Sequence, residues 1–337
     1  MNSILVAQFT TVDAHCGGAP LRLLTGGAPS PRGRTIRDKT AWMARHADGV
    51  RRTLMLEPRG HRDMTGAMLT EPMSPGSHAG LIFMNADGYP SMAGHGVMAA
   101  TLIALNRGLV VPGRDDRSIV FDTVAGTVRA HASSAGPDIR SARVSFTNVP
   151  SFVLHAGVSV KASGRLIRAD VAFAGAFYAI VDAESAGVAV DMAHVPLLRQ
   201  LGRDVIDAIE SSLVIAHPLH ADVTGLAGTL FTGPPGLGGA HLRNVTVLAG
   251  GCAGRAPSGT GMSAIMAVLD AMGLLGDDVP FEQEGLSGAS FHGRIASRTM
   301  VGDRPAIVPE ITGGAWLTGE QVVYADPTDP FGEGLSV

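Results

Sequence analysis

Cysteine is scarce in this sequence, and its scarcity excludes two kinds of protein. The two cysteines, Cys16 and Cys252, are too few for a disulfide framework, and their spacing is not that of a metal site. Aromatic residues are also few, at 5%, whereas the 337 residues include 44 glycines. A glycine-rich chain with 45% apolar residues is expected to join many short strands by tight turns. At this length we expect two domains.

Charge and long apolar runs are limited as well. Charged residues make up 17% of the chain and the formal net charge is −4, so we expect no nucleic-acid partner. The longest uncharged stretch, 88–106, is interrupted by Pro90, His95 and several glycines, so we expect no membrane span. Residues 1–7 lack the basic and apolar segments of a secretory signal. We therefore predict a cytoplasmic enzyme.

The sequence does contain one short pattern in two copies. In each copy a small residue precedes Gly-x-Gly, and an apolar run of helical character follows. The copies are Ala93-Gly94-His95-Gly96 before the run 97–105, and Ser258-Gly259-Thr260-Gly261 before the run 262–272. Strands are predicted ahead of them, at 80–84 and 243–248. The two halves of the chain are therefore expected to share one arrangement of strands, turn and helix.

The repeated turn has a physical interpretation as part of a ligand site. Glycines before a helix let the backbone approach a ligand closely, and the free N–H groups and dipole of the first helical turn favour an anion. Two such turns facing each other would hold a carboxylate from both sides, with Ala93 and Ser258 flanking the ligand. For either copy alone, an ordinary tight turn is the simpler interpretation.

Other elements follow from the residue pattern. Strands are expected at 4–12, 20–24, 67–70, 118–123, 126–130, 142–147, 151–155, 171–181 and 225–231, and helices at 35–52 and 195–212. A loop is expected at 13–18, where His15 beside Cys16 suggests either an activated thiolate or, as we favour, a buried structural cysteine. His61 and Asp63 are better explained by a structural role than as metal ligands or an acid/base pair.

Five segments, taken together and in order, resemble the proline racemase family, which also includes hydroxyproline 2-epimerases and trans-3-hydroxyproline dehydratases. They are Glu-Pro-Arg-Gly-His-x-Asp-Met-x-Gly at 57–66, Met-x-Gly-His-Gly at 92–96, Arg-Asn-Val at 243–245, Arg-x-Pro-x-Gly-Thr-Gly at 255–261 and Asp-Pro-x-Asp-Pro-Phe at 326–331. The resemblance extends over nearly the whole chain.

The resemblance implies an α/β (α+β) fold like that of diaminopimelate epimerase. In that fold two similar domains each wrap a curved sheet around a central helix, with the substrate between them. The first domain would be 1–132 together with a C-terminal return, 310–337, and the second would be 133–309. The substrate would be proline or a hydroxyproline, with no metal or pyridoxal cofactor, and a homodimer would be common for the fold. Substrate-binding positions would be Gly94, His95, Gly96, Gly254, Gly259, Thr260 and Gly261.

Three positions depart from the family pattern. Racemases and epimerases of the family have cysteine where this chain has Ala93 and Ser258. Inverting a stereocentre without a cofactor requires a base on one face of Cα and an acid on the other, and alanine can be neither. The dehydratases keep the first cysteine and have threonine at the second position. Gly254 stands where the family usually has an aspartate that receives the ammonium group of the substrate.

Three functions remain open at this point. The first is a racemase or epimerase in which Ser258 is one acid/base and His95, or a water that it holds, is the other. The second is a dehydratase acting on a 3-hydroxyproline-like substrate, and the third is a binding protein without catalysis. Two further alternatives are that Ala93 is an engineered replacement of a catalytic residue, and that Cys252 takes the place of the missing thiol. We favour proton transfer at Cα of a proline-like amino acid.

Overall fold

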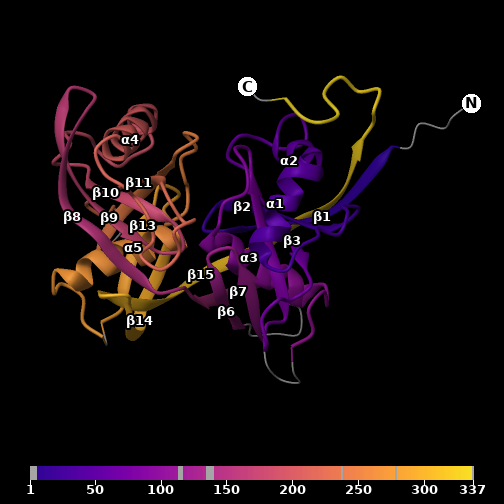
Figure 1. Cartoon of the computed structure of the whole chain (residues 1–337), viewed down its shortest axis with the longest axis horizontal. Helices are drawn as coiled ribbons and strands as arrows, with labels where there is room; N and C mark the ends of the chain where they lie inside the picture. Colours follow the sequence, from indigo (N-terminus) through magenta and orange to yellow (C-terminus); the bar gives the residue numbers. More distant parts are fainter. Residues whose placement is uncertain (1–5, 113–116, 134–139, 237, 278, 336–337) are drawn as a thin grey trace, which may run out of the picture. The chain divides into compact units, whose positions relative to one another are not determined.

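The computed structural model describes residues 6–112, 117–133, 140–236, 238–277 and 279–335 (Figure 1). The chain divides into two compact units, one made of Met1–Val144 with Gly314–Val337 and the other of Ser145–Gly313. Each unit contains one helix that is buried against strands and begins with the Gly-x-Gly residues, which were expected to precede it. In the described part of the chain, the helices are too short or too polar to cross a membrane.

The first unit is built around α3 (Gly94–Asn106), and nearly every residue of this helix is buried. Because its sequence is apolar on all sides, the helix is stable only when protein surrounds it. Strands of the sheet pack against it, notably the β1–β2 hairpin at its N-terminal half. In sheet order the strands are β1 (Ala7–Cys16), β2 (Ala19–Gly26), β3 (Thr65–Thr70), β4 (Ala79–Asn85), β5 (Ser118–Thr123), β6 (Gly126–Ser133) and β7 (Ser141–Thr147).

Two expectations for the first unit were wrong in detail. The predicted helix 35–52 is two helices, α1 (Ile36–His46) and α2 (Asp48–Met55), because Ala47 between them leaves the helical conformation at φ −144°. The predicted loop 13–18 is shorter, since β1 continues to Cys16 by pairing with β2 and β15. The first two residues of the predicted strand 4–12 lie outside the described residues.

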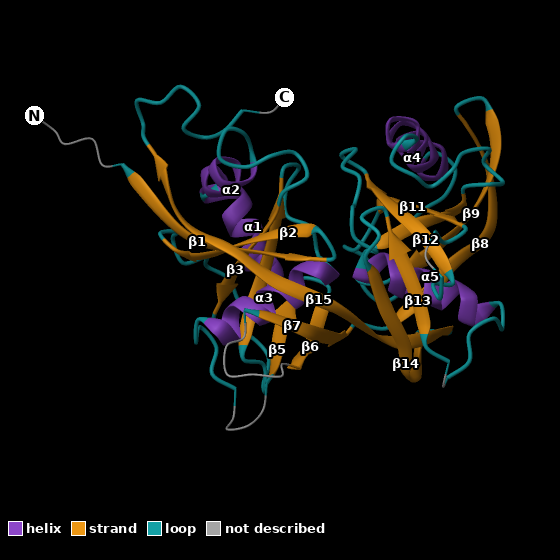
Figure 2. Cartoon of the chain, turned by 180° about the vertical axis from the view of Figure 1, so that it is seen from behind, coloured by secondary structure: helices purple, strands orange, loops and turns teal. Residues whose placement is uncertain are grey.

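The second unit repeats the arrangement around α5 (Gly259–Ala271), which packs against strands of this unit (Figure 2). The first ten residues of α5 are all buried. A second helix, α4 (Val195–Glu210), packs on the opposite face of β11 and β12, where Gly202 lies against Val247 and Phe231. The strands in sheet order are β8 (Ser151–Ala162), β9 (Arg165–Phe173), β10 (Phe177–Asp182), β11 (Leu226–Gly233), β12 (Leu242–Leu248), β13 (Phe281–Gly285), β14 (Ser290–Val301) and β15 (Arg304–Ala325).

The predicted single strand 171–181 was also wrong, because it is the end of β9 and the start of β10. The chain reverses at Gly175, which has φ +92°, and Ala174 N–H donates to the carbonyl of Ala176. A glycine tolerates this left-handed conformation, and the neighbouring apolar residues hid the turn from the pattern.

The long strand β15 begins in the second unit, where it pairs with β14, and ends in the first, where it pairs with β1. The segment after it remains on the first unit. Leu335 N–H donates to the carbonyl of Glu57 at 2.6 Å, and Thr53 Oγ1 donates to the carbonyl of Gly332 at 3.0 Å. Arg59 forms an ion pair with Asp329.

Candidate functional site

The first turn places Ala93 at the N-cap of α3. Its backbone is extended, with φ −144° and ψ 102°, and its carbonyl accepts the N–H of Val97 at 2.9 Å. β4 delivers the chain to this turn through a bend in which the side chain of Asn85 accepts the N–H groups of Asp87 and Gly88. Ala93 contributes only a methyl group, so this turn offers backbone N–H groups and the helix dipole, without a side-chain acid or base at that position.

His95 lies in the first turn of α3, and its two ring nitrogens have different surroundings. One nitrogen hydrogen-bonds the backbone of Pro20, which has no N–H, so the ring donates to the Pro20 carbonyl. Nε2 is buried and has no hydrogen-bond partner among the described residues, so the donor is Nδ1. Burial lowers the pKa of His95 to about 4. The imidazole is therefore neutral at pH 7, with a lone pair on Nε2.

The second turn places Ser258 at the N-cap of α5, where its Oγ accepts the N–H of Gly261 at 3.1 Å. Ser258 has φ +35°, a left-handed conformation that costs about 1–3 kcal/mol for a residue with a side chain. A Cβ at Gly261 would lie 2.6 Å from Leu230 and 3.1 Å from Ser258 Cβ, so this turn requires glycine there. The Ser258 hydroxyl is thus held at the positive end of the helix.

Thr260 follows in the same turn and is buried. A hydrogen bond of 3.0 Å joins its Oγ1 to the hydroxyl of Tyr178 on β10. Burial raises the pKa of Tyr178, although this hydrogen bond opposes the shift, so the phenol is neutral. Tyr178 therefore orients the Thr260 side chain and is a residue that the sequence pattern did not single out. Its position in an apolar strand offered no signal beyond being one of three tyrosines.

Residues of β12 and β13 hold the segment that leads to Ser258 through hydrogen bonds. Gly254 N–H donates to the carbonyl of Thr246 at 2.8 Å, and Gln283 Nε2 donates to the carbonyl of Pro257 at 2.8 Å. A Cβ at Gly254 would fit without displacing its neighbours, because it would lie 3.6 Å from the carbonyl oxygen of Thr246 and 3.7 Å from the Thr246 Cβ, which is ordinary van der Waals contact. Gly254 therefore lies directly against Thr246.

The structure shows the surroundings of the two cysteines and of His15. Cys16 is fully buried, and burial raises its thiol pKa, which confirms a structural cysteine rather than an activated thiolate. The ring of His15 stacks on Trp316, with centroids 5.1 Å apart. Cys252 is buried as well, in the bend that follows β12. Among the residues that the structure describes, no three histidine, cysteine or acidic side chains are grouped to hold a metal ion.

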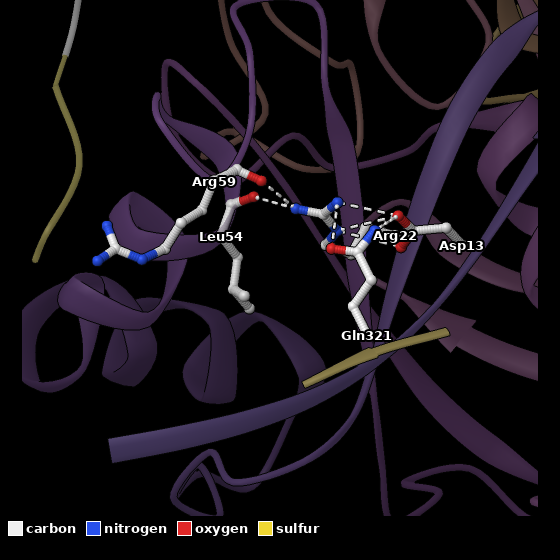
Figure 3. A network of polar contacts seen from close by, with 5 residues as sticks. All are labelled: Asp13, Arg22, Leu54, Arg59 and Gln321. Carbon is white, nitrogen blue, oxygen red and sulfur yellow. Dashed lines mark hydrogen bonds and ion pairs between the residues drawn. The ribbon is translucent and has the colours of Figure 1, made fainter. Parts of the chain in front are cut away.

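Arg22, another residue that the sequence analysis missed, supports the first turn indirectly (Figure 3). This buried side chain on β2 donates to Asp13 at 2.9 Å, to the carbonyls of Leu54 and Arg59, and to Gln321. The network connects β1, β2, the end of α2 and β15. Because β2 also carries Pro20, the network holds the strand that orients His95. The available signal was a single charge within the otherwise apolar strand 19–26.

Comparison with known proteins agrees with this fold. The family model described as Proline racemase matches residues 11–336. The chain therefore belongs to the proline racemase family, and the resemblance noted in its sequence is confirmed.

Relatives within this family have different reactions in their names. A trans-3-hydroxy-L-proline dehydratase from Bacillus cereus is 37% identical over 327 residues, which are 97% of each chain. A 4-hydroxyproline 2-epimerase from Streptosporangium roseum is 38% identical over 328 residues, which are 97% of this chain and 98% of the relative.

Solved structures confirm the fold class. A hydroxyproline epimerase from Agrobacterium vitis with bound trans-4-hydroxy-L-proline superposes with a TM-score of 0.90 at 28% identity, covering 98% of this chain and 95% of the other. A PhzF-family protein from Bacillus anthracis, at 10% identity, shares only the fold, with a TM-score of 0.60 over 94% of this chain and 99% of that one. The chain has the diaminopimelate-epimerase-like fold.

Proposed function

We propose that this protein moves the Cα proton of proline or a hydroxyproline, as a racemase or epimerase with a divergent acid/base pair. The observation that carries the proposal is that both buried helices begin at a Gly-x-Gly turn with a proton-transfer group beside it. At α3 the group is the neutral imidazole of His95, and at α5 it is the hydroxyl of Ser258. The named activities of the relatives support the same reaction at Cα.

In the proposed reaction the backbone N–H groups of both turns bind the substrate carboxylate. Gly94, His95, Gly259 and Thr260 would supply these donors. Gly96 and Gly261 shape the turns by leaving room for the side chains of Phe83 and Leu230. Removing the Cα proton sends negative charge into the carboxylate, and donors already aimed at that charge lower the barrier. No metal or pyridoxal cofactor is part of the proposal.

His95 and Ser258 would exchange protons with Cα from opposite faces. Nε2 of His95 accepts a proton in one direction, and the Ser258 hydroxyl donates one, leaving an alkoxide that the Gly261 N–H and the α5 dipole stabilise. A helix dipole contributes up to about 2 kcal/mol, and about 1.4 kcal/mol is a tenfold change in rate. Because a histidine of low pKa and a serine are weaker bases than a thiolate, we expect slow turnover.

A dehydratase is the second candidate, favoured by the Bacillus cereus relative. Eliminating water from 3-hydroxyproline needs one base at Cα and a group that assists loss of the hydroxyl. Ser258 would take the assisting role and His95 that of the base.

One experiment separates these functions. L-Proline, trans-4-hydroxy-L-proline and trans-3-hydroxy-L-proline are incubated with the protein in deuterium oxide, and Cα deuteration, optical rotation and pyrroline formation are followed. Exchange with inversion is the expected result, whereas loss of water identifies the dehydratase. Measurable binding of pyrrole-2-carboxylate without any exchange would overturn both and leave a binding protein.

The variant Ala93→Cys tests the first turn in the same assay. A thiol at the N-terminus of α3 would form a thiolate more readily than a free thiol with its reference pKa of about 8.5. We expect Cα exchange to rise at least about tenfold, and Ala93→Ser serves as the matched control. An Ala93→Cys protein that folds, binds substrate and gains nothing would contradict the placement of Cα beside residue 93.

The homodimer and the cytoplasmic location remain predictions of the proposed function. Sedimentation equilibrium of the purified protein tests the first, and cell fractionation tests the second.

A further inference from the structure

Three buried polar side chains in the second unit have polar atoms without hydrogen-bond partners among the described residues. They are Asn244, through both Oδ1 and Nδ2, Thr246, through Oγ1, and Gln283, through Oε1. Their exposed fractions are 0%, 4% and 0%. A fold normally pairs such groups, so a cluster of four unpaired atoms requires an explanation.

These side chains lie on one face of two neighbouring strands. Val247 of β12 packs against α4, so alternation along the strand directs Thr246 and Asn244 to the opposite face. On β13, Glu284 pairs with Arg243 directly across the strands, which directs Gln283 and Gly285 to the face of Asn244. The cluster therefore occupies the α5 side of the sheet.

The same face lies against the segment that leads to Ser258. A Cβ on Gly285 would lie 2.6–2.7 Å from backbone atoms of 255–257, and Gln283 holds the carbonyl of Pro257. Thr246 lies beside Gly254, with a Cβ built on Gly254 3.7 Å from that of Thr246. The side chains with unpaired atoms thus adjoin the segment that leads to the proposed substrate-binding turn, at Gly254 and Pro257.

The chemistry of the cluster is uncharged. It offers two amide groups and a hydroxyl, whereas the charged neighbours Arg243 and Glu284 pair with each other on the other face. A ligand ammonium group would be buried there without a counter-charge, which is strongly unfavourable. A hydroxyl group, which both donates and accepts, matches an amide carbonyl, an amide N–H and the threonine hydroxyl.

We propose that Asn244, Thr246 and Gln283 form a subsite that binds a hydroxyl group on the ring of the substrate. The inference rests on the proposed function, and it makes a hydroxyproline the preferred substrate over proline. A site built to hydrogen-bond a substrate hydroxyl discriminates strongly against the analogue without it, because its buried polar groups are then left unpaired. Ordered water in the cluster is the alternative, and it predicts no such preference.

Isothermal titration calorimetry with L-proline, trans-3-hydroxy-L-proline and trans-4-hydroxy-L-proline tests the proposal on the full chain. We expect one hydroxylated ligand to bind about 100-fold more tightly than L-proline, and the ring position of its hydroxyl identifies the geometry. Thr246→Val is expected to reduce this preference about tenfold. Thr246→Ser, which keeps the hydroxyl, is expected to retain the preference.

Thr229→Val is the matched control. Thr229 is a buried threonine on the adjacent strand β11, but its hydroxyl donates to the Gly202 carbonyl on the α4 side. This variant is expected to change stability without changing the preference. Equal affinities of the wild-type protein for all three ligands would overturn the subsite, as would a preference that Thr246→Val leaves intact.

Deuterium exchange at Cα separates the failure of the subsite from the failure of the proposed function. Exchange of all three ligands without a hydroxyl preference rejects the subsite alone. A hydroxyl preference that Thr246→Val removes, in a protein without exchange, supports the subsite and rejects catalysis.

Discussion

Ser258 has two roles and an unusual backbone conformation. Its hydroxyl caps α5 and is the group that we assign to proton transfer, and its backbone is held in a left-handed conformation. The cap and the strain act in opposite directions on stability. The hydroxyl satisfies the Gly261 N–H, while the positive φ is unfavourable for any side chain.

Two substitutions at Ser258 separate these roles. Ser258→Ala loses the cap and keeps the strain, so its free energy of unfolding should fall by about 1–2 kcal/mol. Ser258→Gly loses the cap and relieves the strain, so it should stay within about 0.5 kcal/mol of the wild type. Both should lose Cα exchange. Urea unfolding measures the free energy of unfolding of both variants. Equal losses of stability in Ser258→Ala and Ser258→Gly would show that the positive φ of Ser258 is not strained.

His95 should make stability depend on pH. Its pKa is about 4 in the folded protein and about 6.5 when unfolded, because burial disfavours the charged ring. The unfolded chain therefore binds the proton first, and the contribution of His95, complete above pH 6.5, is lost as the pH falls from about 6.5 to 4. The loss amounts to about 3 kcal/mol.

The variant His95→Asn isolates this effect, because carboxylates titrate in part of the same range. Between pH 7 and pH 4, we expect the free energy of unfolding of the wild type, measured in urea, to fall by about 3 kcal/mol more than that of His95→Asn. If the free energies of unfolding of the two proteins change with pH in parallel, the His95 ring is not buried in its neutral form.

At the scale of elements, both helices after the Gly-x-Gly turns depend on strands distant in sequence. The start of α3 is held by β2 through Pro20, and the start of α5 by β13 through Gln283. The Arg22 network fixes β2 in turn (Figure 3). The geometry of each turn is therefore a property of the surrounding sheet as well as of the local glycines.

Arg22→Met tests the network at this scale. Removing the guanidinium leaves the Asp13 carboxylate without its cation, although Gln321 still donates to it at 2.8 Å, and leaves two backbone carbonyls without this donor. Breaking a buried ion pair on one side costs about 3–5 kcal/mol. The double variant Arg22→Met with Asp13→Asn should recover part of this loss, because no unpaired charge remains. Urea unfolding measures both proteins, and a single variant as stable as the wild type would contradict the role of the network.

At the scale of the whole molecule, two units repeat one arrangement and share one strand. β15 contributes its first part to the second unit and its last part to the first. In the second unit, the sheet from β8 to β14 pairs with the part of β15 that precedes Gly313, so its hydrogen bonds are completed within 145–313.

The fragment 145–313 should therefore fold alone. We expect a far-UV circular dichroism spectrum of mixed helix and strand and a cooperative thermal transition, because α5 remains enclosed by its strands. The first unit is discontinuous in sequence, so 1–144 without 314–337 is the contrasting fragment, expected to lack a cooperative transition because β1 loses β15. A fragment 145–313 that melts without cooperativity would show that the units depend on each other for stability.

Local pattern determined a large part of this protein from the sequence alone. Uniformly apolar runs predicted that 97–105 and 262–272 form helices, since helix formation and burial follow from neighbouring residues. The helices begin three residues earlier than these runs, at Gly94 and Gly259. The motifs identified the family. By contrast, the pattern did not reveal the break in the helix at Ala47 or the chain reversal at Gly175. Each depends on one residue, and the helical or strand pattern continues on both sides of it.

Only the tertiary structure decided the chemistry of the candidate site. The tautomer of His95 depends on Pro20, the orientation of Thr260 on Tyr178, and the grouping of Asn244, Thr246 and Gln283 on the register of two strands. These contacts join residues far apart in the chain, and strand register sets which face a side chain occupies. A shift of one residue would reverse that face, so spacing along the sequence alone could not determine the environment of Ser258.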